Sequence, residues 1–541
     1  MNRNRKVFTA VCACALAATI TAAGTGTLSN AATEHFTDAG EQSARWASFK
    51  SSWDQLSSDY EKVAMSVGAD ASQLNFGWYS RNAETPAVKI GTDKDLTDAK
   101  TFTGTQQEIK DGKDMDQVPL SGYYSNKVTV KGLKASTQYY YSVFKDGAWS
   151  TPASYSTEKT SSFSFMYVGD PQIGASKSQT SKEGDKLTEK YADKALAARN
   201  DAYNWNLVLE NATNKFDNLS FILTAGDQVN TSNNEKEFAG FLSPAALSSV
   251  PLATAIGNHD APTANYGNHF NYPNQQTSAD TTEGRTPAGT DYYFSHGDAL
   301  FIILDTNNYN CATHENVIKK AVKENRDAKW RIVVFHQDIY GSGLDHSDSD
   351  GIILRTQLTP LMDKYDIDMV LQGHDHTYSR TYQLTSDSKK HTAYSAESVK
   401  GMTEDDKASY LNQNQCYSIK SGKISGSVTN PSGTVYMEAN SGTGSKFYNL
   451  IPTQQDYISE RSQTWTPSYS IVNVTKDTLS INTYDGITGK QLEGATSYSI
   501  KKTSGKKAEA TKEASSKKTT KKNTQTSKKS TRTTKKSTTT K

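Results

Sequence analysis

Six short apolar runs between residues 162 and 375 constrain the fold of this 541-residue chain more than any other feature. In chain order they are SFSFMYVGD, LSFILTAGD, PLATAIGNHD, ALFIILDT, WRIVVFHQD and IDMVLQGHD. Runs that are apolar throughout predict strands buried on both faces, as in a layered α/β domain, and helical stretches alternate with them. Five of the runs end in Asp, Asn or His, at the carboxyl ends of strands where open α/β sheets place their functional groups.

Five motifs at these strand ends together predict a metal site. They are GDPQ, AGDQVN, GNHD, VVFHQD and GHDH, and their candidate ligands are Asp170, Asp227, Asn258, His336, His374 and His376. Each motif alone is common by chance, but the whole set directly after buried strands is not. Carboxylates, imidazoles and an amide oxygen suit borderline divalent cations. Two such ions close together need a bridging carboxylate to offset their repulsion, and Asp227 is the candidate.

The chain before the first apolar run divides into two parts. Residues 32–68 have helical spacing around Trp46 and Trp53, which predicts a helical segment. Residues 69–158 contain alternating segments such as LNFGWYS, AVKIGT, SNKVTVKGL and STQYYYSVF, which predict a β-sandwich.

The N-terminus predicts a secreted protein. Residues 1–31 read as a signal peptide, with basic RNRK followed by VFTAVCACALAATITAA and small residues. The apolar run is short and rich in Ala and Thr, which argues against a transmembrane anchor. Cys12 and Cys14 leave with the leader. Cys311 and Cys416 remain, and in an oxidising compartment they either form a disulfide or stay as two buried thiols.

The C-terminus predicts a disordered basic tail. The chain has a net charge of +2, whereas residues 501–541 carry 14 Lys, one Arg and two Glu, a net charge of +13. Their Lys, Thr and Ser composition cannot build a core. The tail is either merely solvated or holds the protein on an anionic cell-wall polymer. Nucleic acid is the less favoured partner because the tail has no aromatic residue for stacking.

Together, these motifs resemble the calcineurin-like metallophosphoesterases, in the purple acid phosphatase branch with an N-terminal fibronectin type III-like domain. The likeness covers roughly residues 70–500, and GHDHTYSRT resembles that branch's glycine-histidine-x-histidine-x-tyrosine-x-arginine signature. The stretch VTVKGLKASTQYYYSVF carries the fibronectin likeness. The resemblance implies an α/β fold: a β-sandwich followed by a four-layer αββα domain over residues 162–500, with an insertion at about 383–432.

The resemblance also implies roles for the candidate residues. Metal one would take Asp170, Asp227 and His376, and metal two would take Asp227, Asn258, His336 and His374. A metal-bound hydroxide would then attack the phosphorus atom of a phosphate ester.

Two histidines are the candidates for binding the phosphate or protonating the leaving group, His259 and His346. Asp260 is expected to orient His259 or to cap the GNHD turn. The residues expected to support the site from behind its ligands are Asp260, Tyr340, Tyr378 and Arg380.

Two positions depart from the family pattern. Gln172 stands where most metallophosphoesterases have a histidine, and Asn230 stands where purple acid phosphatases have a tyrosine. Either amide oxygen, or water, would complete the shell of metal one. Without a phenolate, tyrosinate-bound ferric iron is not expected, and two divalent ions of the Mn, Fe, Zn or Mg/Ca type fit better.

The sequence therefore predicts a secreted phosphoesterase acting on small phosphate esters, with phosphomonoesters favoured. A phosphodiesterase or nucleotide hydrolase using the same site is the close alternative. An alternative of a different class is a catalytically weak cell-surface binding protein whose metal-one site has decayed.

Overall fold

The computed structural model describes residues 44–503, apart from residues 111–112, 114–115, 179–193, 277–284, 345, 348–350, 392–402, 404, 407–408, 410–414 and 423–424. The proposed signal peptide and all but the first residues of the proposed tail lie outside the described residues. None of the helices within the described part of the chain is long and apolar enough to cross a membrane.

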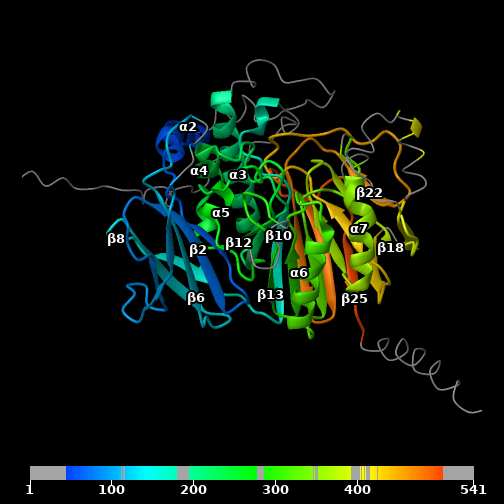
Figure 1. Ribbon diagram of the computed structural model, residues 1–541, viewed down its shortest axis with the longest axis horizontal. Helices are drawn as coiled ribbons and strands as arrows, with labels where there is room; N and C mark the ends of the chain where they lie inside the picture. The colour runs from blue at the N-terminus through cyan, green and yellow to red at the C-terminus, as the bar shows by residue number, and fades with distance from the viewer. Residues whose placement is uncertain are drawn as a thin grey trace, which may run out of the picture.

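The N-terminal domain is a β-sandwich, drawn in blue and cyan in Figure 1. One sheet contains β1 (Ala64–Val67), β2 (Gln73–Ser80), β6 (Tyr124–Lys131) and β5 (Thr105–Glu108). The other contains β4 (Lys100–Thr103), β3 (Ala87–Gly91), β7 (Gln138–Lys145), β8 (Ala148–Trp149) and β9 (Ala153–Ser156). Apolar side chains that alternate along the strands, such as Phe76, Trp78 and Val128, fill the space between the sheets.

The larger domain is built on two further sets of strands. The first comprises β12 (Leu252–Thr254), β11 (Leu219–Thr224), β10 (Ser162–Val168), β23 (Ser468–Thr475), β24 (Thr478–Asp485), β25 (Tyr498–Lys501) and β20 (Gly426–Thr429). The second comprises β13 (Tyr292–His296), β14 (Ala299–Ile303), β15 (Trp330–Val334), β16 (Met369–Gln372), β21 (Val435–Glu438), β17 (Tyr378–Thr381) and β22 (Ile458–Ser462). The six strands expected from the apolar runs are therefore confirmed as β10, β11, β12, β14, β15 and β16.

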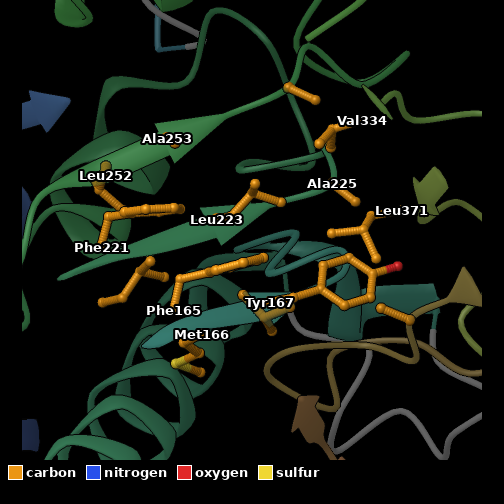
Figure 2. Close-up of a cluster of buried hydrophobic side chains, with 14 of the residues drawn as sticks. Phe165, Met166, Tyr167, Phe221, Leu223, Ala225, Leu252, Ala253, Val334 and Leu371 are labelled. Atoms are coloured by element: carbon orange, nitrogen blue, oxygen red, sulfur yellow. The ribbon is translucent and has the colours of Figure 1, made fainter. Parts of the chain in front are cut away.

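Apolar side chains join the two sheets face to face. Phe165 and Phe221 of the first sheet belong to the same buried cluster as Val334 and Leu371 of the second sheet, as Figure 2 shows. At one end of this interface the hydroxyl of Tyr167 donates to the carbonyl of Gln372. These contacts fix the two sheets relative to each other directly behind the strand ends that carry the predicted ligands.

Helices cover the outer faces, which completes the expected four-layer αββα arrangement (Figure 1). The first sheet is covered by α3 (Lys194–Lys215) and α4 (Glu235–Phe241), on which α2 (Ala44–Ser57) packs. The second sheet is covered by α6 (Cys311–Glu324) and α7 (Gly351–Lys364). A short helix, α5 (Asn265–His269), contacts the sandwich at β2 and β6. The α/β prediction is confirmed.

The sandwich is joined to the larger domain by its backbone as well as by its side chains. Strand β1 pairs in parallel with β12 at Ser66 and Leu252, so one sheet runs through both domains. His269, the last residue of α5, is buried; its ring centroid lies 4.3 Å from that of Tyr79 of the sandwich, and its Nε2 lies 2.8 Å from Glu235 Oε2. No sequence pattern predicts that one sheet continues through both domains.

Two further differences concern the predicted insertion and the cysteines. The described part of residues 383–432 contains β18 (Gln383–Ser386) paired with β19 (Tyr417–Ser421), in addition to β20. Cys311 and Cys416 do not form a disulfide, so that possibility is wrong for this fold. Cys311 begins α6 near Asp291, whereas Cys416 lies near Arg355, and both thiols are buried.

Candidate metal centre

The predicted ligands meet where the carboxyl ends of the parallel strands meet. Asp170 follows β10, Asp227 follows β11, and Asn258 follows β12, all on the first sheet. On the second sheet, His336 follows β15, and β16 is followed by His374 and His376. Asn258 is exposed, whereas the other five side chains are buried. Packing of the two sheets therefore creates one centre from residues more than 200 positions apart in the sequence.

The backbone around this centre adopts a conformation that L-residues rarely adopt. Five non-glycine residues there have positive φ: Asp170 (36°), Gln172 (36°), Asp227 (49°), His374 (82°) and His376 (45°). Such conformations are unfavourable, and they cluster where a site needs particular side-chain directions. Gly226 has a φ of 106°, and a Cβ there would lie 2.5 Å from His336 Nδ1, so no larger residue fits. The strained loops thus aim the ligands.

Four atoms that can bind a metal ion lie close together around His336 Nε2. His336 Nε2 lies 2.9 Å from Asn258 Oδ1, 3.0 Å from His374 Nδ1 and 3.4 Å from Asp227 Oδ2. All of these atoms carry lone pairs, so at least some of the contacts are unfavourable without a proton or a cation between them. A divalent ion with imidazole, amide and carboxylate ligands fits this arrangement.

A second group of atoms lies around Asp170. Its Oδ1 is 3.4 Å from His376 Nε2 and 3.8 Å from His336 Nδ1, and it is buried without a hydrogen-bond partner. Its Oδ2 accepts a hydrogen bond of 2.9 Å from the backbone N–H of His374. Asp170, Asp227 and His336 also offer one atom each within 4.8 Å of one another. A buried carboxylate oxygen with no donor fits a second cation.

Backbone carbonyls orient two of the histidines. His336 Nδ1–H donates to the carbonyl of Ala225 at 2.9 Å, and His376 Nδ1–H donates to that of Lys446 at 2.6 Å. These bonds leave each Nε2 as the atom that faces the centre, as metal-bound histidines require. Burial opposes a charge on His336, but Asp227 and Asp170 outweigh it and raise its pKa to about 10. The carboxylates of the centre thus attract positive charge.

Comparisons with known proteins agree with this geometry. A family model described as calcineurin-like phosphoesterase matches residues 163–378, and one described as purple acid phosphatase, N-terminal domain, matches residues 60–157. Residues 163–378 therefore form a calcineurin-like phosphoesterase domain, and residues 60–157 form a purple acid phosphatase N-terminal domain. The matched ranges contain the sandwich and every predicted metal ligand.

The similarity to a solved structure supports the fold alone, because the sequence identity is low. The purple acid phosphatase PPD1 from seeds of yellow lupin (Lupinus luteus) has a TM-score of 0.57 at 15% identity, covering 82% of this chain and 74% of that chain. A structure of PhoD has a TM-score of 0.47 at 11% identity, covering 81% of this chain and 93% of that chain. An uncharacterised protein of Mycobacterium tuberculosis (strain H37Rv) is 31% identical over 62 residues, which are 12% of this chain and 12% of that protein.

Gln172 and Asn230, the two positions where the chain departs from the family pattern, differ in their surroundings. Gln172 is buried, and its Oε1 has no hydrogen-bond partner. Its backbone N–H donates to the carbonyl of Asp227 at 2.8 Å. Asn230 is only partly buried, and its side-chain amide donates to Thr231 Oγ1 at 3.3 Å. The buried acceptor without a donor is therefore on Gln172.

The two histidines expected to contact substrate lie on the more open side of the centre. His259 is partly exposed; its backbone N–H donates to Asp227 Oδ1 at 2.9 Å, and its Nδ1–H donates to the carbonyl of Asn230 at 2.6 Å. The ring of His346, also partly exposed, lies 4.0 Å from the ring of His374. Its Nε2 is 3.4 Å from the hydroxyl of Tyr448, a residue that the sequence did not indicate.

The four expected supporting residues have different surroundings. Asp260 accepts hydrogen bonds from Gly257 N–H (2.9 Å) and from the side chain of Gln228 (2.8 Å), so it holds the turn rather than the ring of His259. The hydroxyl of Tyr340 lies 3.0 Å from that of Thr359 in the core beneath α7. The remaining two both bind Glu460, at 2.5 Å from the hydroxyl of Tyr378 and 3.0 Å from the guanidinium of Arg380.

Asp201, a residue that positions the site, carries no sequence signal. Asp201 of α3 accepts backbone N–H groups of Gly174 (2.8 Å) and Ser176 (3.2 Å), which holds the loop that follows Asp170. Its burial raises its pKa to about 7. No motif marks Asp201, because its partner loop is more than 20 residues away in the sequence. Only the packing of α3 on the sheet brings the two together.

Proposed function

We propose that this metallophosphoesterase hydrolyses phosphate esters with two divalent ions. The convergence of Asn258, His374 and Asp227 atoms within 3.4 Å of His336 Nε2 supports this function most. The buried oxygen of Asp170 that lacks a donor supports a second ion. When bound, two such ions lower the pKa of a water molecule and neutralise the phosphate charge.

We assign the ligands as the family pattern suggests. Metal one would be held by Asp170, Asp227 and His376, and metal two by Asp227, Asn258, His336 and His374. Asp227 suits the bridging role because its Oδ1 is held by the backbone N–H of His259 while its Oδ2 faces His336. Mn, Fe, Zn and Mg/Ca are the candidate metals. The chain has no tyrosine at position 230 to bind ferric iron.

Gln172 is our candidate for completing metal one. A buried amide oxygen without a donor loses about 1–3 kcal/mol of hydrogen-bond free energy, so a cation beside it would remove a penalty. Asn230 is only partly buried, so water can satisfy its amide oxygen, which makes it the weaker candidate. An amide is a neutral, weak ligand, so this ion should be the more easily removed by chelators.

His259 and His346 are our candidates for acid–base chemistry. The Nδ1–H of His259 is engaged by the carbonyl of Asn230, so its Nε2 is the atom left to exchange a proton with substrate. His346 lies against the ring of His374 and is the second candidate for binding phosphate or protonating the leaving group. Both sit beside the ligands without belonging to the ligand set.

Hydrolysis of p-nitrophenyl phosphate and of its bis-ester tests the proposal, with Mn, Zn or Fe added to protein stripped by chelation. We expect metal-dependent turnover, faster with the monoester, and a loss of roughly 10³-fold or more in Asp227→Asn, which keeps the shape but removes the bridging charge. Asp477→Asn is the matched control, because the side chain of this acid is 66% exposed and pairs with Lys329 at the surface. Faster turnover of the bis-ester would favour a phosphodiesterase.

The alternative of a binding protein predicts a different result. In that case neither substrate would show metal-dependent turnover, and Asp227→Asn would match the parent protein. The centre opposes this alternative, because five strained backbone positions are kept around it at a free-energy cost.

We also propose that the enzyme is secreted and held at the cell wall by its basic tail. The apolar leader at residues 1–31 and the net charge of +13 in residues 501–541 support this. Retention on cells across a salt series, with and without residues 502–541, tests the second part. Equal retention of both forms would remove the anchoring role.

A further inference from the structure

Three carboxylates lie together beside the metal centre without belonging to its ligand set. Asp338 follows β15, Asp375 stands between the two histidines of GHDH, and Glu438 ends β21. All three side chains are fully buried, and one oxygen from each lies within 4.8 Å of the others. Among the described residues, the imidazole of His346 acts electrostatically on Asp375. One histidine cannot balance three carboxylates, so the acidic triad keeps a net negative charge when all three are ionised.

The hydrogen-bond donors around the acidic triad are unevenly distributed. Glu438 is well supplied: its donors are the backbone N–H groups of Ser342 (3.0 Å) and Thr377 (3.3 Å) and the hydroxyls of Thr377 (2.7 Å) and Ser379 (2.8 Å). Asp338 and Asp375 instead share the hydroxyl of Ser347, which has one proton to donate, and Asp375 Oδ2 also accepts the backbone N–H of Ser347 at 2.8 Å. The Oδ1 atoms of both aspartates are buried without any hydrogen-bond partner.

Buried carboxylates this close together cannot all stay ionised without compensation. Either protons or a cation must supply it. The donor atoms are all oxygens, from three carboxylates and a hydroxyl, which is the ligand set of a hard divalent cation. The glycine at position 341 keeps the space open, because a Cβ there would lie 2.0 Å from Asp338 Oδ2 and 2.8 Å from Glu438 Oε2.

We propose that the acidic triad, with the hydroxyl of Ser347, binds a calcium ion at a site separate from the dinuclear centre. Calcium fits better than magnesium because the site is fully buried, and magnesium usually keeps several of its waters whereas calcium accepts protein oxygens in flexible geometry. Zinc is not expected, because the site offers no nitrogen or sulfur ligand. This site goes beyond the proposed phosphoesterase activity and does not depend on it.

The position of the acidic triad gives the calcium ion a role. Asp338 is two residues after His336, and Asp375 is adjacent to both His374 and His376. Glu438 lies on β21, which pairs with both β16 and β17. A calcium ion would thus tie together the two loops that carry three of the histidine ligands. It acts as a positioning element and takes no part in the reaction itself.

The test uses the full chain, stripped of metal, reloaded with zinc and then given calcium chloride. We expect about one equivalent of calcium to remain per chain after gel filtration. We also expect the Tm to rise, by roughly 5 °C at a calcium concentration of 100 times Kd. Asp338→Asn should lose both responses while keeping the zinc content of the parent protein. Asp227→Asn should lose zinc but keep both calcium responses.

Two outcomes would overturn the proposal. If calcium neither binds nor changes the Tm, and Asp338→Asn is more stable than the parent at every calcium concentration, protons compensate the acidic triad instead. If the calcium response survives in Asp338→Asn and disappears in Asp227→Asn, the calcium occupies the dinuclear centre. Ser347→Ala, which removes only a neutral ligand, replaces Asp338→Asn if that variant fails to fold; it should weaken calcium binding at least several-fold.

Discussion

Exchange of Gln172 for residues of similar length tests most directly how this protein completes its first metal site. In the structure, Gln172 Oε1 is buried and accepts no hydrogen bond. Such an acceptor costs about 1–3 kcal/mol when it is left unsatisfied. Gln172→Met removes the polar atoms but keeps the length. We therefore expect the metal-free variant to unfold with a free energy about 1 kcal/mol higher than the parent protein.

The same substitution should have the opposite effect on metal binding. Loss of one ligand should weaken metal one at least 10-fold, or about 1.4 kcal/mol. Gln172→Glu should reverse both effects. It supplies a charged ligand that tightens metal one, but in the metal-free protein its charge joins Asp170 and Asp227, which should lower stability by roughly 2–4 kcal/mol.

Two measurements decide the matter: guanidinium unfolding of the chelated proteins, and metal content after dialysis against a graded series of chelator concentrations. Asn230→Ala is the matched control and should change neither by much, because this side chain is only partly buried and water can satisfy its amide oxygen. Parent-like metal retention in both Gln172 variants would refute the reasoning. If Asn230→Ala alone empties metal one, Asn230 is the ligand.

Two further predictions concern stability. Glu460→Ala should lower the free energy of unfolding by about 3–5 kcal/mol in a guanidinium titration, because it removes the carboxylate that pairs with the buried guanidinium of Arg380; a loss below 1 kcal/mol would show that the pair contributes little. Burial lowers the pKa of His296 to about 4, so the unfolded chain takes up a proton near pH 6.5 that the folded chain refuses. Stability should thus fall as the pH falls from 6.5 to 4, by at most about 3 kcal/mol from this group. His296→Phe, beside Phe163, should lose less stability over that range, and parallel pH profiles of the two proteins would contradict this.

The sequence predicted the strands and the candidate ligands because both signals are local. A run such as SFSFMYV is buried on whichever sheet it joins, and the residue after it necessarily emerges at the strand's carboxyl end. Parallel pairing then brings Asp170, Asp227 and Asn258 to one edge. These candidate ligands can be predicted without knowing which distant residues lie beside them in the fold. The sequence also marked Gln172 and Asn230 as exceptions, but both offer the same chemical group.

Tertiary structure decided what depends on contacts between distant segments. It separated Gln172 from Asn230, because the burial of an amide and its available donors depend on the packing around it. It joined the sandwich to the larger domain through β1 and β12, which share no sequence signal. It also placed Glu438 beside two aspartates of the ligand loops. Hydrogen bonding, burial and charge repulsion all act across space, so only the packed chain determines which polar groups have partners and which are left for a ligand.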